Sequence, residues 1–313
     1  MADIGAYLGV PLTLADGSVY GTFCCLSHEP DPSLSERDLR FMALLADLIV
    51  EDIDRSRTHA RRREAIQGLI DRDDLLTACQ PIIDLNDGRC LGVEALARFP
   101  EPFTRPDLAF AGAHAVGLGF ELERLAAYKA ARVLPLLEPQ QFLTINVSPE
   151  VVRLLARRAS AMPNLPLGRM VAEITEHAVV DSYSQLRDDL GPLRERGLRI
   201  AIDDAGAGYA SLHHVVELKP DFIKVDRSLV DGVAGDHARR VAVSAFVLLA
   251  LDLNARVVAE GVEERADLSA LCDLGVDAAQ GYLLARPSTD LADLWHWRWQ
   301  SPQHAALIAG ARS

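Results

Sequence analysis

The chain has 313 residues, of which 49% are hydrophobic and 25% charged, a composition typical of a folded globular protein and unlike that of disordered or collagen-like chains. Its length suits one large domain or two of ordinary size. The 45 acidic residues outnumber the 32 basic ones and give a formal net charge of −13. This charge argues against broad binding to nucleic acid polymers or anionic membranes, because both need a basic surface. An anionic small molecule stays compatible with it, since a bound metal ion can reverse the local field.

No segment of the sequence is predicted to cross a membrane or to act as a secretory signal. The longest apolar run, residues 241–251, is interrupted by Ser244 and is too short to span a bilayer. The N-terminus has no basic segment followed by an apolar core. The five cysteines form no C-x-x-C pair, which favours reduced thiols over disulfides or zinc ligands. We therefore expect a cytoplasmic protein.

The first predicted elements are two strands, residues 6–14 and 18–26. Both runs are apolar and rich in β-forming residues, and the Asp-Gly turn between them predicts a hairpin. A helix is expected from about residue 33 onward. Two overlapping capping boxes are available to open it, Ser33 with Glu36 or Ser35 with Asp38.

Apolar residues recur along this helix in steps of three and four, at Leu39, Met42, Ala46, Ile49 and Ile53. The stripe is short for a coiled coil, so it predicts packing either on the preceding hairpin or on a second helix. A hairpin and one helix are too small to bury much core. The runs YLGVPL and GSVYGTFC, followed by a Leu-rich helix, resemble the C-terminal part of a GAF domain, a small-ligand or dimerising sensor module. We assign residues 1–54 to this fragment.

The rest of the chain is predicted to form a helical connector followed by alternating strands and helices. Residues 55–63 form a basic run that predicts a solvated helical connector, within a linker at residues 55–73. From residue 74, short apolar strands alternate with segments of helical length, such as 179–195 and 237–253. Strands are expected at 78–85, 91–98, 142–148, 169–176, 198–205, 222–226, 256–262 and 277–285. This alternation predicts an α/β fold with mostly parallel strands closed into a barrel.

The first two of these strands are joined by residues 86–89 alone, a link that allows an antiparallel hairpin but not a parallel crossover. The expected fold is therefore a modified TIM-type (β/α)8 barrel with an antiparallel first strand, preceded by the N-terminal hairpin and helix. We place the barrel at residues 74–300 and a C-terminal tail at residues 301–313.

Polar and acidic residues stand at the C-terminal ends of the predicted strands, where the chemistry of such barrels collects. In chain order they are Glu94, Asn146, Glu173, Asp203, Asp204, Lys224, Glu260 and Gln280. Unpaired, so many buried carboxylates would be destabilised by desolvation and mutual repulsion. A divalent cation, or two, is the expected partner.

The donor set is all oxygen apart from one lysine, which favours Mg²⁺ or Mn²⁺ over zinc. The adjacent Asp203 and Asp204 allow one carboxylate to bridge two ions while the other holds one. Two ions a few ångströms apart are the usual apparatus of phosphodiester hydrolysis. Lys224 would orient the attacking water or offset developing charge, and the alternative is a plain salt bridge to Asp203 or Asp226.

Seven motifs in this order resemble the EAL domain, a bacterial phosphodiesterase domain that linearises cyclic di-GMP. The signature tripeptide is Glu94-Ala95-Leu96, within QPIIDLNDGRCLGVEALARF. The others are INVSPE (145–150), EITE (173–176), DDAGAGYASL (203–212), IKVDRSLV (223–230), AEGVE (259–263) and QGYLLARP (280–287). The resemblance covers residues 74–300 and implies metal-dependent hydrolysis of cyclic di-GMP to linear 5′-pGpG.

The resemblance implies a role for each matching position. One metal ion would be bound by Glu94, Asn146, Glu173 and Asp203, and a second by Asp203, Asp204 and Glu260. The catalytic residues would be Glu94, Asp204, Lys224 and Glu260, with Lys224 positioning the attacking water. Substrate contacts are implied for Gln80, Leu96, Arg98, Asn146, Glu263, Gln280 and Pro287. The cofactors would be two Mg²⁺ or Mn²⁺ ions, with Ca²⁺ inhibitory, and the protein would form a homodimer.

The loop after Asp204 departs from the family pattern of an aromatic residue, Gly, Thr and Gly, because this chain has Ala205-Gly206-Ala207-Gly208. In the family this loop couples the metals to the dimer interface, and Glu176 matches the acid that steadies it. The departure favours a second hypothesis, a catalytically weak or inactive EAL domain that acts as a cyclic di-GMP receptor. A purely structural interaction domain is a third, although it would leave the acid cluster without a purpose.

Overall fold

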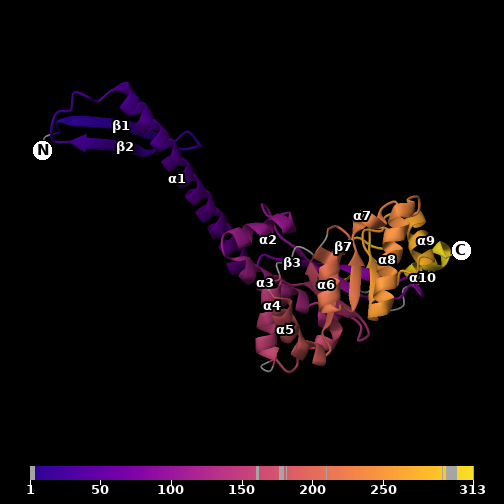
Figure 1. Cartoon of the computed structure of the whole chain (residues 1–313). Helices are drawn as coiled ribbons and strands as arrows, with labels where there is room; N and C mark the ends of the chain where they lie inside the picture. Colours follow the sequence, from indigo (N-terminus) through magenta and orange to yellow (C-terminus); the bar gives the residue numbers. More distant parts are fainter. Residues whose placement is uncertain are drawn as a thin grey trace. The chain divides into compact units, whose positions relative to one another are not determined.

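The computed structural model describes residues 4–159, 162–175, 180, 182–208, 210–290, 292–293 and 302–312 of the chain (Figure 1). The chain divides into two compact units, residues 1–69 with 112–118, and residues 70–111 with 119–313. Among the described residues, no helix combines the length and the apolar character that a bilayer crossing requires.

The smaller unit opens with the predicted hairpin. Strands β1 (Ala6–Thr13) and β2 (Val19–Ser27) pair antiparallel. The turn between them is closed by Asp16, whose Oδ1 accepts a hydrogen bond from the Ser18 backbone N–H at 2.9 Å. Gly17 has a φ of 82°, a conformation that glycine adopts without the steric penalty of a Cβ. The Asp-Gly pair therefore sets the turn, as the sequence predicts.

Helix α1 (Glu36–Asp71) follows, and it begins with the second of the two predicted capping boxes. The Ser35 backbone N–H donates to Asp38 Oδ2 at 3.0 Å. The helix runs unbroken through the predicted connector, because residues 36–71 contain no proline. In this unit the turn that follows helix α2 (Pro106–Ala115) contacts α1, where Arg63 donates to the backbone carbonyl of Val116.

The apolar stripe of α1 packs on the hairpin, which is one of the two arrangements that the sequence allows. Met42 and Ala46 are buried against Val10 and Leu12 of β1. Leu39 was expected in the stripe but is 40% exposed, since it lies one turn before the helix meets the hairpin core.

The larger unit contains a closed barrel with the strand order β10-β3-β4-β5-β6-β7-β8-β9. Its strands are β3 (Leu76–Asp84), β4 (Cys90–Arg98), β5 (Phe142–Asn146), β6 (Met170–Thr175), β7 (Arg199–Ala205), β8 (Phe222–Val225), β9 (Arg256–Ala259) and β10 (Ala278–Ala279). Strand β3 is antiparallel to both of its neighbours, and the remaining pairs are parallel. The predicted eight-stranded barrel with an antiparallel first strand is confirmed.

Helices cover the outside of this barrel (Figure 1). They are α3 (Gly119–Ala131), α4 (Pro149–Arg158), α5 (Tyr183–Glu195), α6 (Ala210–Leu218), α7 (Arg227–Val230), α8 (His237–Leu253), α9 (Arg265–Asp273) and α10 (Pro302–Ala311), with 3₁₀ turns η1 (Leu134–Leu136) and η3 (Leu167–Arg169). Their ends follow local rules. Ser148 caps α4 ahead of Pro149, and Asn254 closes α8 at a φ of 56°.

The last strand is much shorter than the predicted span of 277–285. It ends at Ala279 because residues 281–285 form a turn, in which the backbone N–H groups of Leu284 and Ala285 both donate to the Gly281 carbonyl at 3.0 Å. Gly281 also packs closely on Val262, so a Cβ added at position 281 would lie 2.1 Å from the Val262 carbonyl oxygen. The apolar residues 281–285 therefore form a turn rather than a strand, because Gly281 packs on Val262, which is distant in the sequence.

The barrel interior is built in layers, because alternate residues of each strand point inward. One layer is apolar and contains Ile82, Leu91, Phe142, Val171, Ala201, Phe222, Val258 and Ala278. On or just after strands β5 to β10, the residue two positions further along is polar: Thr144, Glu173, Asp203, Lys224, Glu260 and Gln280. The apolar layer is therefore the floor on which the polar layer rests.

We predict that Phe222→Ala lowers the free energy of unfolding by about 3–5 kcal/mol, because it removes a ring from this floor and leaves a cavity. The Phe222 ring lies 5.3 Å from that of Phe142, centroid to centroid, and the Arg199 guanidinium lies over both rings. Denaturant unfolding measures the effect. The control Leu136→Ala, at a side chain that is 53% exposed, should change stability by less than about 0.5 kcal/mol. Equal effects of the two substitutions would contradict the layered core.

Candidate functional site

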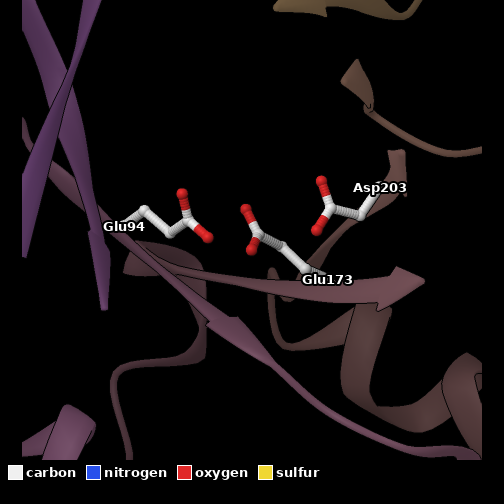
Figure 2. Close-up of side chains that lie close together, drawn as sticks. All are labelled: Glu94, Glu173 and Asp203. Carbon is white, nitrogen blue, oxygen red and sulfur yellow. The ribbon is translucent and has the colours of Figure 1, made fainter. Parts of the chain in front are cut away.

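The acidic residues predicted at the strand ends meet at one mouth of the barrel. Glu94 comes from β4, Glu173 from β6 and Asp203 from β7, and all three are buried. One carboxylate oxygen of each lies within 4.8 Å of the others. Figure 2 shows their carboxylates turned toward one another. Asp203, Asp204 and Glu260 form a second such group, so Asp203 belongs to both.

The adjacent pair Asp203 and Asp204 reaches one site because the strand is locally irregular. In a regular strand, neighbouring side chains point to opposite faces. Asp204 has a φ of 54°, in the left-handed region that Asp tolerates better than most residues. The pairing of β7 with β8 shifts register between Ile202 and Ala205. This break allows both carboxylates to join the group that contains Glu260.

Lys224 lies at the centre of the acids. Its Nζ is 2.7 Å from Glu260 Oε1, 3.0 Å from Glu173 Oε1, 3.0 Å from Asp203 Oδ1 and 3.6 Å from Glu94 Oε1. The lysine side chain is only 2% exposed. Asp226, the other partner considered from the sequence, instead caps α7 by accepting from the Ser228 backbone N–H. Lys224 thus contacts four of the acids rather than a single one.

Burial and charge perturb these groups in predictable directions. Burial raises the pKa of Glu173 well above its usual range, against the attraction of Lys224 and with a further rise from Glu94 and Asp203. Burial raises the pKa of Glu260 for the same reason. For Lys224 burial alone would lower the pKa, but the surrounding carboxylates outweigh it and hold the pKa well above the usual value. The lysine is therefore an ammonium at neutral pH.

Amide side chains complete the polar layer. Gln280 Nε2 donates to Gln80 Oε1 at 2.8 Å and also to Glu94. Asn146 Nδ2 donates to Glu94 Oε1 at 3.4 Å. Gln80 Nε2 donates to the Ala285 carbonyl at 2.9 Å, which ties the layer to the turn after β10. The amides thus hold Glu94 in place from two sides.

The cluster fits a hard divalent cation. Four carboxylates contact a single ammonium, so the buried charge stays negative unless protons or cations are bound. Glu173 Oε2 is buried without a hydrogen-bond partner, and Glu173 Oε1 and Asp203 Oδ1 are buried with only the ion pair to Lys224 at 3.0 Å. Oxygen donors of this kind match Mg²⁺ and Mn²⁺. The chemistry of these residues therefore agrees with metal binding.

A cavity of about 250 Å³ opens beside the acids. Its wall includes the predicted residues Gln80, Glu94, Leu96, Asp203, Glu260, Glu263 and Gln280. Arg98, Asn146 and Pro287 are not among the lining residues, although Asn146 contacts Glu94. Arg98 instead donates from Nη1 to the Ala97 carbonyl at 2.9 Å. Glu176 lies outside the residues that the structure describes.

The cavity wall also contains Arg227, Gly261, Gly281 and Tyr282, which the sequence analysis did not select. Arg227 is the residue after the IKVD run that carries Lys224, and Tyr282 belongs to the QGYLLARP motif. Both residues come shortly after the C-terminal end of a strand, and this position was the sequence signal that could have indicated a place at the site. An arginine is common on protein surfaces, however, so its place on this wall is visible only in the fold.

The divergent loop begins inside the core. Ala205 is fully buried, and its carbonyl accepts from the Asp226 backbone N–H at 3.1 Å. Gly206 has a φ of 103°, and a Cβ there would lie 2.3 Å from Leu229 Cδ1. Ala207 donates its N–H to the Asp204 carbonyl at 3.1 Å and closes a turn. The loop is therefore an ordered turn up to this point despite its two alanines.

Comparisons with known proteins agree with this architecture. Residues 63–287 match the family described as EAL domain, and residues 1–53 match the family described as GAF domain. The probable cyclic di-GMP phosphodiesterase PdeD of Escherichia coli (strain K12) is 31% identical over 235 residues, which are 70% of this chain and 42% of PdeD. This chain spans 30–42% of the length of the first three curated relatives.

Solved structures are similar over the same region. The PaMucR phosphodiesterase in complex with c-di-GMP has a TM-score of 0.65 and 28% identity, and the match covers 72% of this chain and 97% of that one. Klebsiella pneumoniae BlrP1 in complex with manganese and cyclic di-GMP at pH 9.0 has a TM-score of 0.60 and 32% identity. That match covers 68% of this chain and 56% of BlrP1.

The buried acids predict a stability that falls with pH in the absence of metal. The folded-state pKa values of Glu173 and Glu260 are raised above 4.5, so folding favours their protonated forms. Their contribution to the free energy of unfolding is therefore fully present below pH 4.5 and is lost as the pH rises through the raised values. We expect the free energy of unfolding to decrease as the pH rises above 4.5 in the presence of EDTA, measured by denaturant unfolding.

Glu173→Gln is the matched variant, because it removes one titrating group with little change of shape. Its pH dependence should be weaker than that of the unmodified protein. Added Mn²⁺ should stabilise the unmodified protein more at pH 8 than at pH 5, since its ligands must be deprotonated. Identical pH dependence in both proteins would show that Glu173 does not titrate as described.

Proposed function

The chain belongs to the EAL domain family, and we propose that it hydrolyses cyclic di-GMP to linear 5′-pGpG in bacterial second-messenger signalling. The observation that carries this proposal is the complete set of acids around Lys224 beside a cavity. Lys224 Nζ lies within 3.6 Å of four carboxylates that stand on, or directly after, four different strands. The catalytic residues proposed are Glu94, Asp204, Lys224 and Glu260.

The metal-binding residues proposed are Glu94, Asn146, Glu173 and Asp203 for one ion, and Asp203, Asp204 and Glu260 for a second. The grouping of the carboxylate oxygens within 4.8 Å in two sets that share Asp203 supports this assignment. Bound Mg²⁺ or Mn²⁺ would neutralise the phosphodiester and make water a better nucleophile. Ca²⁺ tolerates looser geometry and polarises water less, so it would allow binding but suppress turnover.

Lys224 acts in this proposal as a donor rather than as a base. Its pKa is raised by the surrounding carboxylates, so it keeps its proton at neutral pH. An ammonium at this place holds the attacking water by donating hydrogen bonds and offsets charge that develops on the phosphate oxygens. Water attacks one phosphorus, the bond to the 3′ oxygen breaks, and the ring opens with a 5′-phosphate and a 3′-hydroxyl.

Substrate binding is proposed at the cavity and its surroundings. Gln80, Leu96, Glu263 and Gln280 line the cavity, which supports their assignment as substrate contacts. Arg98, Asn146 and Pro287 are proposed on their positions in the family motifs alone. The loop at residues 205–208 and Glu176 are proposed to couple the site to a dimer partner.

A catalytically weak receptor for cyclic di-GMP is the second candidate. It is favoured by the two alanines of the loop after Asp204, where the family has an aromatic residue and a threonine. Ala205 is buried beside the acids on β7, so the difference lies close to the proposed metal ligands. The acids themselves are complete, which is why we place hydrolysis first.

We propose that residues 1–54 are the C-terminal part of a GAF-like domain, 55–73 a helical linker, 74–300 the EAL barrel and 301–313 a C-terminal tail. The matches to residues 1–53 and 63–287 support this division. We also propose a cytoplasmic location, which the five cysteines support because all are free thiols.

The proposed activity is tested by incubating the protein with cyclic di-GMP and Mg²⁺ or Mn²⁺ and separating the nucleotides by chromatography. We expect 5′-pGpG as product, and a loss of at least about 100-fold in kcat for both Glu94→Gln and Lys224→Met. Glu264→Gln is the control, since this exposed residue opens α9 outside the cavity wall. Binding of intact cyclic di-GMP without turnover would favour the receptor, and absence of binding would overturn both candidates.

A homodimer is proposed as the functional state. Support comes from apolar side chains on helix surfaces, with Val241, Leu248 and Leu251 of α8 at least 54% exposed. On α1, Phe41, Leu44 and Leu48 are at least 62% exposed and offer a second contact. Light scattering should give about twice the chain mass of 34.1 kDa at micromolar concentration, and Leu248→Glu should lower it. The control Asp252→Asn should leave the measured mass unchanged. A monomeric mass for the unmodified protein would contradict the proposal.

A further inference from the structure

Two oppositely charged side chains lie together on the cavity wall. Arg227 Nη1 is 3.0 Å from Glu263 Oε1, and both residues line the cavity beside the acids. Their side chains are 53% and 36% exposed, so a ligand in the cavity can reach them. Arg227 belongs to none of the catalytic or metal-binding groups described above. The inference that follows rests on the proposed function.

The backbone beneath fixes where the arginine lies. Gly261 has a φ of 67°, and a Cβ there would lie 2.6 Å from Arg227 Cγ and 2.9 Å from its Cδ. The alkyl part of Arg227 therefore lies directly on the glycine backbone, between Glu260 and Glu263 in the sequence. This packing restricts the guanidinium in a way that an exposed ion pair alone would not.

Such a pair is poorly suited to hold a phosphate. Its charges cancel, and a carboxylate next to the guanidinium would repel an anion. It presents instead a row of N–H donors beside carboxylate acceptors. The arginine fork has five N–H groups and the carboxylate can accept several hydrogen bonds, so both keep capacity for a ligand after the contact between Nη1 and Oε1.

Guanine has the complementary edge. Its O6 and N7 accept hydrogen bonds, and arginine commonly donates to both. Its N1–H and 2-amino group donate, which suits a carboxylate. Adenine has an amino group in place of O6 and an unprotonated N1, so it would set a donor against the arginine and an acceptor against the glutamate.

We propose that Arg227 is a specificity-determining residue, which reads a guanine base of the cyclic dinucleotide together with Glu263. The guanidinium donates to O6 and N7, while the Glu263 carboxylate accepts from N1–H and the 2-amino group. The proposed metal-binding residues would bind the ions that contact the phosphodiester, and the Arg227–Glu263 pair would select the base.

The test measures binding rather than turnover. Dissociation constants for cyclic di-GMP and cyclic di-AMP are determined by calorimetry in the presence of Ca²⁺, for the unmodified full chain, Arg227→Ala, Arg227→Lys and Arg265→Ala. The unmodified protein should prefer cyclic di-GMP at least about tenfold, and Arg227→Ala should lose at least about tenfold of that preference. Arg265→Ala, at an exposed arginine of α9 outside the cavity wall, should keep it.

Lysine keeps the charge of arginine but not its planar fork, so Arg227→Lys should also lose most of the preference. Equal weakening of both ligands by Arg227→Ala, or full recovery in Arg227→Lys, would show a role through charge alone and overturn the inference. An unmodified protein that binds both nucleotides equally would also overturn it. An unmodified protein that binds neither would instead overturn the proposed function, and this inference with it.

Discussion

The contact of one buried ammonium with four carboxylates is the constraint on which this structure depends. Glu173 is fully buried and Lys224 nearly so, and neither charge is stable in such a place alone. The arrangement persists because each acid reaches the same lysine from a different strand of the barrel. A barrel supplies this geometry, since its parallel strands all end at one mouth. The same geometry collects oxygen donors that suit divalent metal ions.

The rest of the barrel supports this polar layer from below and around it. Aromatic rings of Phe142 and Phe222 belong to the apolar layer beneath the acids. Gln280 and Asn146 orient Glu94, and the irregular end of β7 brings two neighbouring aspartates to one side. The carboxylates proposed to bind metal are also the groups whose burial destabilises the folded protein when no metal ion is bound.

Several features of the molecule followed from local sequence alone. The Asp-Gly turn, the capping box at Ser35 and the number and order of the barrel strands rest on short-range rules of backbone geometry and hydrophobic period. The short link at residues 86–89 was enough to predict an antiparallel pair, and the positions of Glu94, Glu173 and Asp203 at strand ends predicted their meeting. Local propensity decides these features because few residues are involved.

Tertiary structure decided what depends on contacts between distant segments. The strand expected over 277–285 stops at Ala279, because the turn at residues 281–285 packs on Val262. Lys224 contacts four acids, where the sequence allowed a single salt bridge. Arg227 lines the cavity while Arg98 does not, although Arg98 is the last residue of β4 and Arg227 comes two residues after β8. The sequence alone determined the fold class and the acids of the site, because the hydrophobic period and the ends of strands are local features. The tertiary structure set which residues line the cavity, because that depends on packing between segments distant in the sequence.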